Sequence, residues 1–179
     1  RDAQESRGLG DVYKRQGKTM VPTDFTGTTL IPIDQGKDVV FTQKRDYWTG
    51  TLDKGTLTKG KELLTAEAIR KAGLNIKKQW ADKDGLYLMG YMKNDKGENQ
   101  NVVRQYSLQD GQLIQSFEGP LTKEGRGYAV TEHRVVLGQE GGIYWIYRKK
   151  DGKLLGKFKT EPKLTMEILT PMKNDSILI

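Results

Sequence analysis

Short apolar runs separated by polar turn residues recur along most of the chain. The runs at 102–108 and 143–147 alternate between apolar and polar side chains, which is typical of strands. Leu86–Tyr91 is an almost continuous apolar run, as expected for a strand covered on both faces. We therefore predict an all-β fold with strands at residues 28–33, 38–43, 46–52, 86–91, 101–108, 113–117, 128–131, 134–138, 143–148, 153–158 and 164–172.

One segment departs from the strand pattern. In Leu63–Ala72, apolar residues recur at helical spacing. Thr65 is suited to the N-cap of a helix, and Gly73 is suited to the left-handed position that follows the last turn. We predict a short helix at about residues 63–72, inserted where one sheet-forming unit passes to the next.

An internal repeat organises the second half of the chain. Tyr106–Phe117 aligns with Tyr147–Phe158 at a fixed offset of 41 residues, and a tyrosine, an Asp-Gly pair, two apolar residues and a phenylalanine recur in register. A period of about 40 to 45 residues is the length of one four-stranded propeller blade. Asp-Gly between two β-rich runs favours a hairpin with a type I′ turn. We interpret the two segments as the same hairpin in successive blades.

This repeat predicts a β-propeller fragment of about three to four four-stranded antiparallel blades. The expected units are residues 24–75, 76–119 and 126–160 and a truncated unit at 163–179; residues 1–23 are expected to be a disordered or artefactual tail. Apolar hairpin residues should pack between blades; they are Val103, Tyr106, Leu108 and Leu113. We expect missing blades of the same chain to cover the open sheet edges.

The repeated pattern Y-x-x-x-D-G-x-L-[IL]-x-x-F resembles the outer hairpin of quinoprotein-like and WD-type β-propeller blades. The resemblance covers residues 24–179, most clearly in the two later units, and it implies the fold without any cofactor residue. The chain has no Trp-Asp pair at a strand end, and Phe117 and Phe158 stand where the quinoprotein motif often has an indole. Residues 1–16 resemble a translated sequencing linker.

Composition excludes several kinds of site. The chain has no Cys, which excludes disulfide scaffolds, thiol nucleophiles and cysteine metal sites. It has a single His, His133, which argues against a multi-histidine metal site. No apolar stretch approaches the length of a membrane-spanning helix, about 18 residues. We expect no bound metal, no cofactor and no membrane span.

The sequence offers few candidate catalytic residues. Asp46, Asp84 and Glu132 stand at turns or strand starts, where they could form an acid–base pair or act as turn formers, and we favour the second interpretation. His133 follows Glu132 at the start of a strand, but no Gly-x-Ser-x-Gly motif supplies a nucleophile for it to activate. We therefore predict no catalytic residue in this chain.

The formal net charge of +7 raises the question of an anionic partner. Because lysines and arginines are scattered among acidic residues, nucleic acid is disfavoured as a partner. The densest basic cluster, Arg148-Lys149-Lys150, belongs to the repeated outer hairpin, and we interpret it as a solvated rim. The alternative is that this cluster, together with Lys153, Lys157 and Lys159, binds an anionic partner. The candidate residues for any ligand or partner surface are Asp46, Asp84, Glu132, His133, Arg148, Lys149 and Lys150.

These features favour a non-enzymatic β-propeller module for interaction or ligand binding, part of a larger secreted or envelope protein. Its top-face loops would bind a protein or a carbohydrate. The alternative is the propeller segment of a larger hydrolase, of prolyl-oligopeptidase or glycosidase type, with catalytic residues outside this chain. The resemblance implies a periplasmic, cell-envelope or secreted location.

Overall fold

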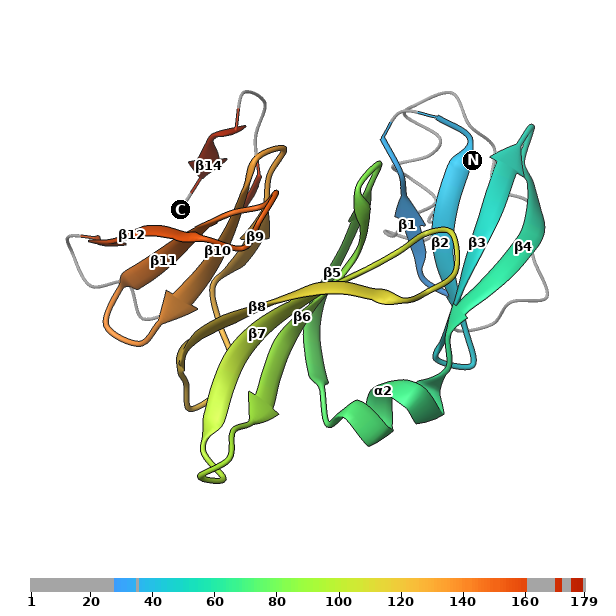
Figure 1. The fold of residues 1–179 in the computed structure, drawn as a ribbon. Helices are drawn as coiled ribbons and strands as arrows, with labels where there is room; N and C mark the ends of the chain where they lie inside the picture. Colours follow the sequence, from blue (N-terminus) through green and yellow to red (C-terminus); the bar gives the residue numbers. More distant parts are fainter. Residues whose placement is uncertain (1–27, 35, 161–169, 172–174, 179) are drawn as a thin grey trace, which may run out of the picture.

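Antiparallel sheets of four strands make up most of the molecule (Figure 1). The computed structural model describes residues 28–34, 36–160, 170–171 and 175–178. The first sheet consists of β1 (Leu30–Pro32), β2 (Asp38–Gln43), β3 (Asp46–Asp53) and β4 (Thr56–Leu64). The second consists of β5 (Asn75–Asp82), β6 (Gly85–Lys93), β7 (Asn99–Tyr106) and β8 (Leu113–Leu121). The third consists of β9 (Tyr128–Val130), β10 (Arg134–Gln139), β11 (Ile143–Arg148) and β12 (Leu154–Lys159).

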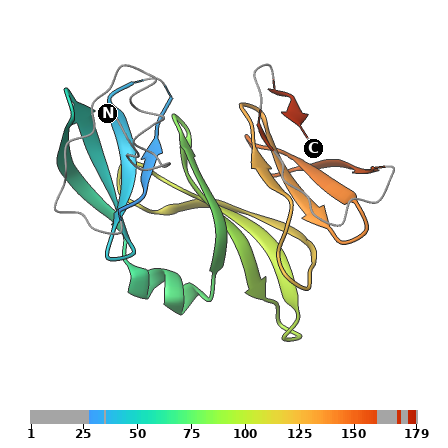
Figure 2. The ribbon, with the colours of Figure 1, turned by 180° about the vertical axis from the view of Figure 1, so that it is seen from behind.

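In each sheet the strands pair in chain order, so every connection within a sheet is a hairpin. The second sheet lies between the other two, and the views from both sides show the same arrangement (Figures 1 and 2). Helix α2 (Ala66–Ala72) joins the first sheet to the second. The pair β13 (Thr170–Pro171) and β14 (Ile177–Leu178) follows the third sheet. Among the residues that the structure describes, these features confirm an all-β, propeller-like architecture with one short helix.

Both faces of the second sheet are buried. Leu86 and Leu88 of β6 pack with residues of the first sheet, whereas Tyr87 and Met89 pack with residues of the third. All four side chains are fully buried, as the continuous apolar run predicts. The faces of the two outer sheets that point away from the second sheet carry apolar clusters of their own.

The repeated segments occupy equivalent hairpins in successive sheets. Tyr106–Phe117 spans β7 and β8, and Tyr147–Phe158 spans β11 and β12. Their loops share the same backbone hydrogen bonds: the amide of Gly111 donates to the Ser107 carbonyl at 2.9 Å, and that of Gly152 donates to the Arg148 carbonyl at 2.9 Å. The sequence repeat therefore corresponds to a structural repeat.

Two details of the predicted hairpins are wrong. The Asp-Gly turns are not type I′, because each loop is longer than two residues and only the glycines, Gly111 (φ 72°) and Gly152 (φ 71°), have positive φ. Leu113 does not pack between sheets. It is 45% exposed and lies at the start of β8, the outermost strand of its sheet.

The predicted helix starts three residues late. Leu63 and Leu64 end β4, and α2 starts only after Thr65, whose extended backbone and side chain cap the helix by accepting the amide of Ala68. Gly73, at φ 74°, ends it in the left-handed conformation as predicted. Strands β4 and β5 were not predicted, because most of their residues are polar or charged; β4 is largely exposed, and most residues of β5 are half-buried or buried.

The expected tail at residues 1–23 and most of the expected strand at 164–172 lie outside the described residues. Within the part of the chain that is described, no helix has the length and apolar character needed to cross a membrane.

Candidate functional site

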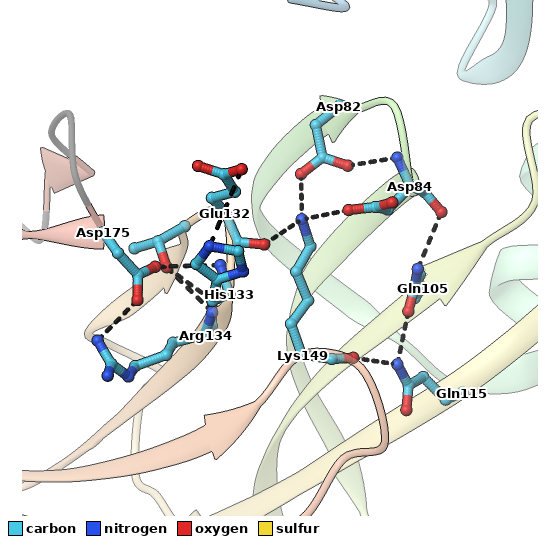
Figure 3. Close-up of polar contacts among 10 residues, drawn as sticks. Asp82, Asp84, Gln105, Gln115, Glu132, His133, Arg134, Lys149 and Asp175 are labelled. Carbon is cyan, nitrogen blue, oxygen red and sulfur yellow. Dashed lines mark hydrogen bonds and ion pairs between the residues drawn. The ribbon is translucent and has the colours of Figure 1, made fainter.

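A hollow of about 650 Å³ opens between the second and third sheets, where their hairpin turns converge. The β5–β6 turn contributes Lys83 and Asp84, the β9–β10 turn contributes Glu132 and His133, and the β11–β12 loop contributes residues 148–150. Strands β7 and β8 complete the lining with Gln105, Ile114 and Gln115. Polar residues from three separate turns therefore surround one space (Figure 3).

Lys149 is the central cation of this site. Its side chain is only 6% exposed, and its ammonium group lies 2.6 Å from Oδ2 of Asp82 and 3.0 Å from Oδ2 of Asp84. The same group donates to the backbone carbonyl of Glu132 at 3.4 Å. Because Asp82 and Asp84 belong to the second sheet and Lys149 to the third, this buried ion pair joins the two sheets (Figure 3).

An aromatic ring lies beneath this ion pair. The Lys149 ammonium lies 5.3 Å from the centroid of the Tyr87 ring, within the range of a cation–π contact. Burial raises the pKa of Tyr87 far above its usual value, and the charges of Asp82 and Asp84 raise it further. Tyr87 therefore stays protonated, and its neutral ring faces the ammonium.

Two glutamines connect the same turns through hydrogen bonds. Gln105 donates to the backbone carbonyl of Asp84 at 2.9 Å, and Gln115 donates to the side-chain oxygen of Gln105 at 2.8 Å. Gln115 also donates to the backbone carbonyl of Lys149 at 2.6 Å. The wall of the hollow is therefore held in place by hydrogen bonds from both sheets (Figure 3).

The β9–β10 turn is fixed from its far side by Asp175. The backbone amide of His133 donates to Asp175 at 3.0 Å, the Arg134 guanidinium pairs with Asp175 at 2.6 Å, and Thr131 bonds to it through its hydroxyl. The His133 side chain is 71% exposed, with Nε2 only 3.9 Å from Glu132. His133 therefore stands at the open rim of the hollow.

The charged groups on the floor of the hollow form ion pairs, whereas two lysines on its rim do not. Asp82 and Asp84 compensate the charge of Lys149 on the floor, and Asp151 pairs with Arg148 at 2.9 Å. Lys83 and Lys150 line the hollow, are exposed, and form no ion pair with any described residue. The floor therefore holds two carboxylates and one ammonium group, whereas the rim carries the cationic groups of Lys83 and Lys150 beside the exposed carboxylate of Glu132.

The structure gathers six of the seven residues proposed from the sequence around this hollow: Asp84, Glu132, His133, Arg148, Lys149 and Lys150. Asp46 lies elsewhere, and its carboxylate accepts the amide of Ala66 at 2.7 Å at the start of α2. The expectation that Arg148-Lys149-Lys150 forms one solvated rim is wrong for Lys149, because its side chain turns inward to two carboxylates.

Sequence reasoning missed the residues that complete the site: Asp82, Lys83, Gln105, Ile114 and Gln115. Asp82 and Asp84 flank the turn that follows β5, so their spacing was a usable signal. The glutamines carry no such signal, because they become neighbours only when β7 and β8 pair.

No group of three or more His, Cys, Asp or Glu side chains placed to hold a metal ion occurs among the residues that the structure describes. No protein-family model and no curated protein matches this sequence.

Proposed function

We propose that the chain is a non-enzymatic ligand-binding module of the β-propeller class, and that the hollow between its second and third sheets binds an acidic carbohydrate. The 41-residue repeat and the equivalent hairpins of successive sheets support the class. The convergence of three turns on one hollow with a cationic rim carries the function.

The lining suits a sugar that carries a carboxylate or sulfate. Lys83 and Lys150 are exposed and form no ion pair with a described residue, so their ammonium groups can contact the anionic group, while Glu132 supplies an acceptor for hydroxyl groups. Ile114, 52% exposed, presents an apolar surface on which the C–H face of a sugar ring can pack. A hollow of about 650 Å³ has the volume of small-molecule sites, which runs from about 300 to 1,000 Å³.

Titration calorimetry with oligogalacturonate, compared with the neutral maltohexaose, tests this proposal. We expect saturable binding of the acidic oligosaccharide that weakens as salt is added, and at least about tenfold weaker binding of the neutral one, a difference of roughly 1.4 kcal/mol. The charge-reversal variant K83E/K150E should lose the binding without a change in melting temperature, because both side chains are exposed.

The matched control is K44E/K54E, which reverses two exposed lysines in turns of the first sheet. It changes the net charge equally and should bind oligogalacturonate as the unchanged chain does. Equal loss in both variants would show a non-specific charge effect and would contradict the proposed site. Cleavage of the oligosaccharide by the chain would contradict a non-enzymatic role.

A further inference from the structure

A second and larger hollow, of about 930 Å³, lies at the other end of β5, between the first and second sheets. One wall is the turn between β2 and β3, the second is helix α2, and the third is the first half of β5. Figure 1 shows α2 at the end of the molecule where the first and second sheets are joined. The hollow is independent of the candidate carbohydrate site, which lies on the opposite face of the second sheet.

Its inner surface carries an apolar patch. Ile69 of α2, Leu74 and Ile76 line it and pack against the core cluster between the first and second sheets. The hydroxyl of Tyr47 donates to Oε1 of Gln79 at 2.5 Å, and burial raises the pKa of Tyr47 to about 12. The tyrosine is therefore neutral at physiological pH, and it orients Gln79 at the inner end.

Its opening is cationic. Arg45 in the β2–β3 turn and Arg70 on α2 line the hollow from opposite walls, and neither forms an ion pair with a described residue. The one lining carboxylate, Glu67, is already paired with Lys71 at 3.1 Å. Two guanidinium groups above an apolar surface are complementary to a carboxylate attached to an apolar body.

Arg45 has a backbone conformation that residues with a long side chain rarely adopt. Lys44 (φ 51°) and Arg45 (φ 68°) form a two-residue turn in which both residues are left-handed. Such turns favour Asn-Gly, because at positive φ the Cβ atom of other residues approaches a backbone carbonyl oxygen. The chain nevertheless places a long arginine there, at the opening of the hollow.

We propose that this hollow binds a small amphiphilic carboxylate, with its apolar body against Ile69, Leu74 and Ile76 and its carboxylate between Arg45 and Arg70. A free aliphatic acid is the class of ligand that these groups fit. The inference does not depend on the carbohydrate site, because the two hollows share no lining residue.

Octanoate titrated into the full, isotopically labelled chain and followed by NMR is the direct test. We expect saturable shifts at the amides of Arg45, Ile76 and Gln79 at millimolar octanoate or below. Octanol and octylammonium, which share the apolar body, should bind at least about tenfold more weakly, because they lack the negative charge. Equal binding of octanol, no saturable shift, or shifts confined to other residues would overturn the proposal.

The variant R45G separates binding from folding. Glycine adopts positive φ without strain, so R45G should keep or raise the melting temperature while octanoate affinity falls about tenfold or more. K44G relieves the same turn but leaves the opening unchanged, and it should bind octanoate as the unchanged chain does. R70Q should weaken binding in the same way as R45G. If R45G and R70Q bind octanoate normally, the arginines are not part of a binding site.

Discussion

Lys149 has its side chain buried in an ion pair that links two sheets. It stands between Arg148 and Lys150, two exposed residues, yet its own side chain is buried against Asp82 and Asp84. A buried cation is tolerated only where partners compensate its charge, and here the partners come from another sheet. The neighbouring residues in the sequence give no indication of this pairing.

Replacing this lysine should therefore destabilise the fold. K149M keeps most of the apolar stem but removes the charge, which leaves two carboxylates close together with no cation between them. We expect a loss of about 2–3 kcal/mol in the free energy of unfolding, measured by urea denaturation, because removal of one partner strands the other. Asp84 is half-exposed, which keeps the loss below that of a fully buried pair.

K150A is the control for this prediction and should change stability by less than about 0.5 kcal/mol, because Lys150 is exposed. In a double-mutant cycle, D82N combined with K149M should cost less than the sum of the two single changes. Additive costs would show that the ion pair does not couple the two sheets.

At the scale of the element, the repeated hairpins have the same backbone but different surroundings. Gly111 and Gly152 share a left-handed φ, 72° and 71°. A Cβ added at Gly111 would lie 1.9 Å from the backbone carbonyl oxygen of Leu63 in the first sheet, whereas at Gly152 the nearest atom is a side-chain oxygen of Gln115 at 3.2 Å. The first hairpin thus packs on the backbone of the preceding sheet, and the second hairpin does not.

The matched variants G111A and G152A measure this difference. Both carry the cost of a left-handed alanine, about 1–2 kcal/mol. G111A should cost at least about 2 kcal/mol more, because a backbone carbonyl has to move, while the Gln115 side chain can adjust. Urea midpoints of the two variants provide the comparison. Equal midpoints would mean that the β7–β8 turn does not pack on Leu63 as the structure shows.

At the scale of the whole molecule, stacked sheets bury tyrosines in their interfaces. Tyr47 belongs to the cluster between the first and second sheets, and Tyr87, Tyr128 and Tyr147 belong to the cluster between the second and third. Burial raises the pKa of all four, to about 12 for Tyr47 and Tyr147 and further for the other two. The charge of Glu118 also contributes at Tyr147.

These shifts predict a loss of stability at alkaline pH. An unfolded tyrosine loses its proton near pH 10, while the folded ones hold theirs to about 12 or above. The unfolded state therefore binds fewer protons in this window, so the stabilisation is complete below about pH 10 and falls as pH rises toward 12. Urea midpoints measured across this range should decrease, and Y47F should make the decrease shallower.

Tyrosinate absorbance gives an independent check. Of the eight tyrosines in the sequence, the four whose pKa is raised by burial should ionise only as the chain unfolds, together with loss of the β-sheet circular dichroism signal; they are Tyr47, Tyr87, Tyr128 and Tyr147. Ionisation of all eight near pH 10 in a chain that keeps its sheet signal would contradict the buried interfaces.

The local pattern of apolar and capping residues in the sequence predicted most of the strands and the helix. Alternating and continuous apolar runs predicted most strands, and Gly73 predicted the end of α2 because capping depends on residues within one turn. Thr65 was also a correct N-cap signal, although the helix was predicted to start at residue 63. The 41-residue repeat predicted successive equivalent hairpins because each unit is built from local contacts. Strands β4 and β5 were missed, since polar strands are specified by pairing with neighbours more than by their own residues.

The tertiary structure decided which side chains meet. The sequence named Asp84, Glu132, His133 and Lys149, but only the stacking of two sheets brings their turns around one hollow. Asp46, chosen on the same grounds, caps a helix instead. Periodicity depends on neighbours along the chain, whereas a site depends on distances between residues far apart in sequence, and packing alone fixes those distances.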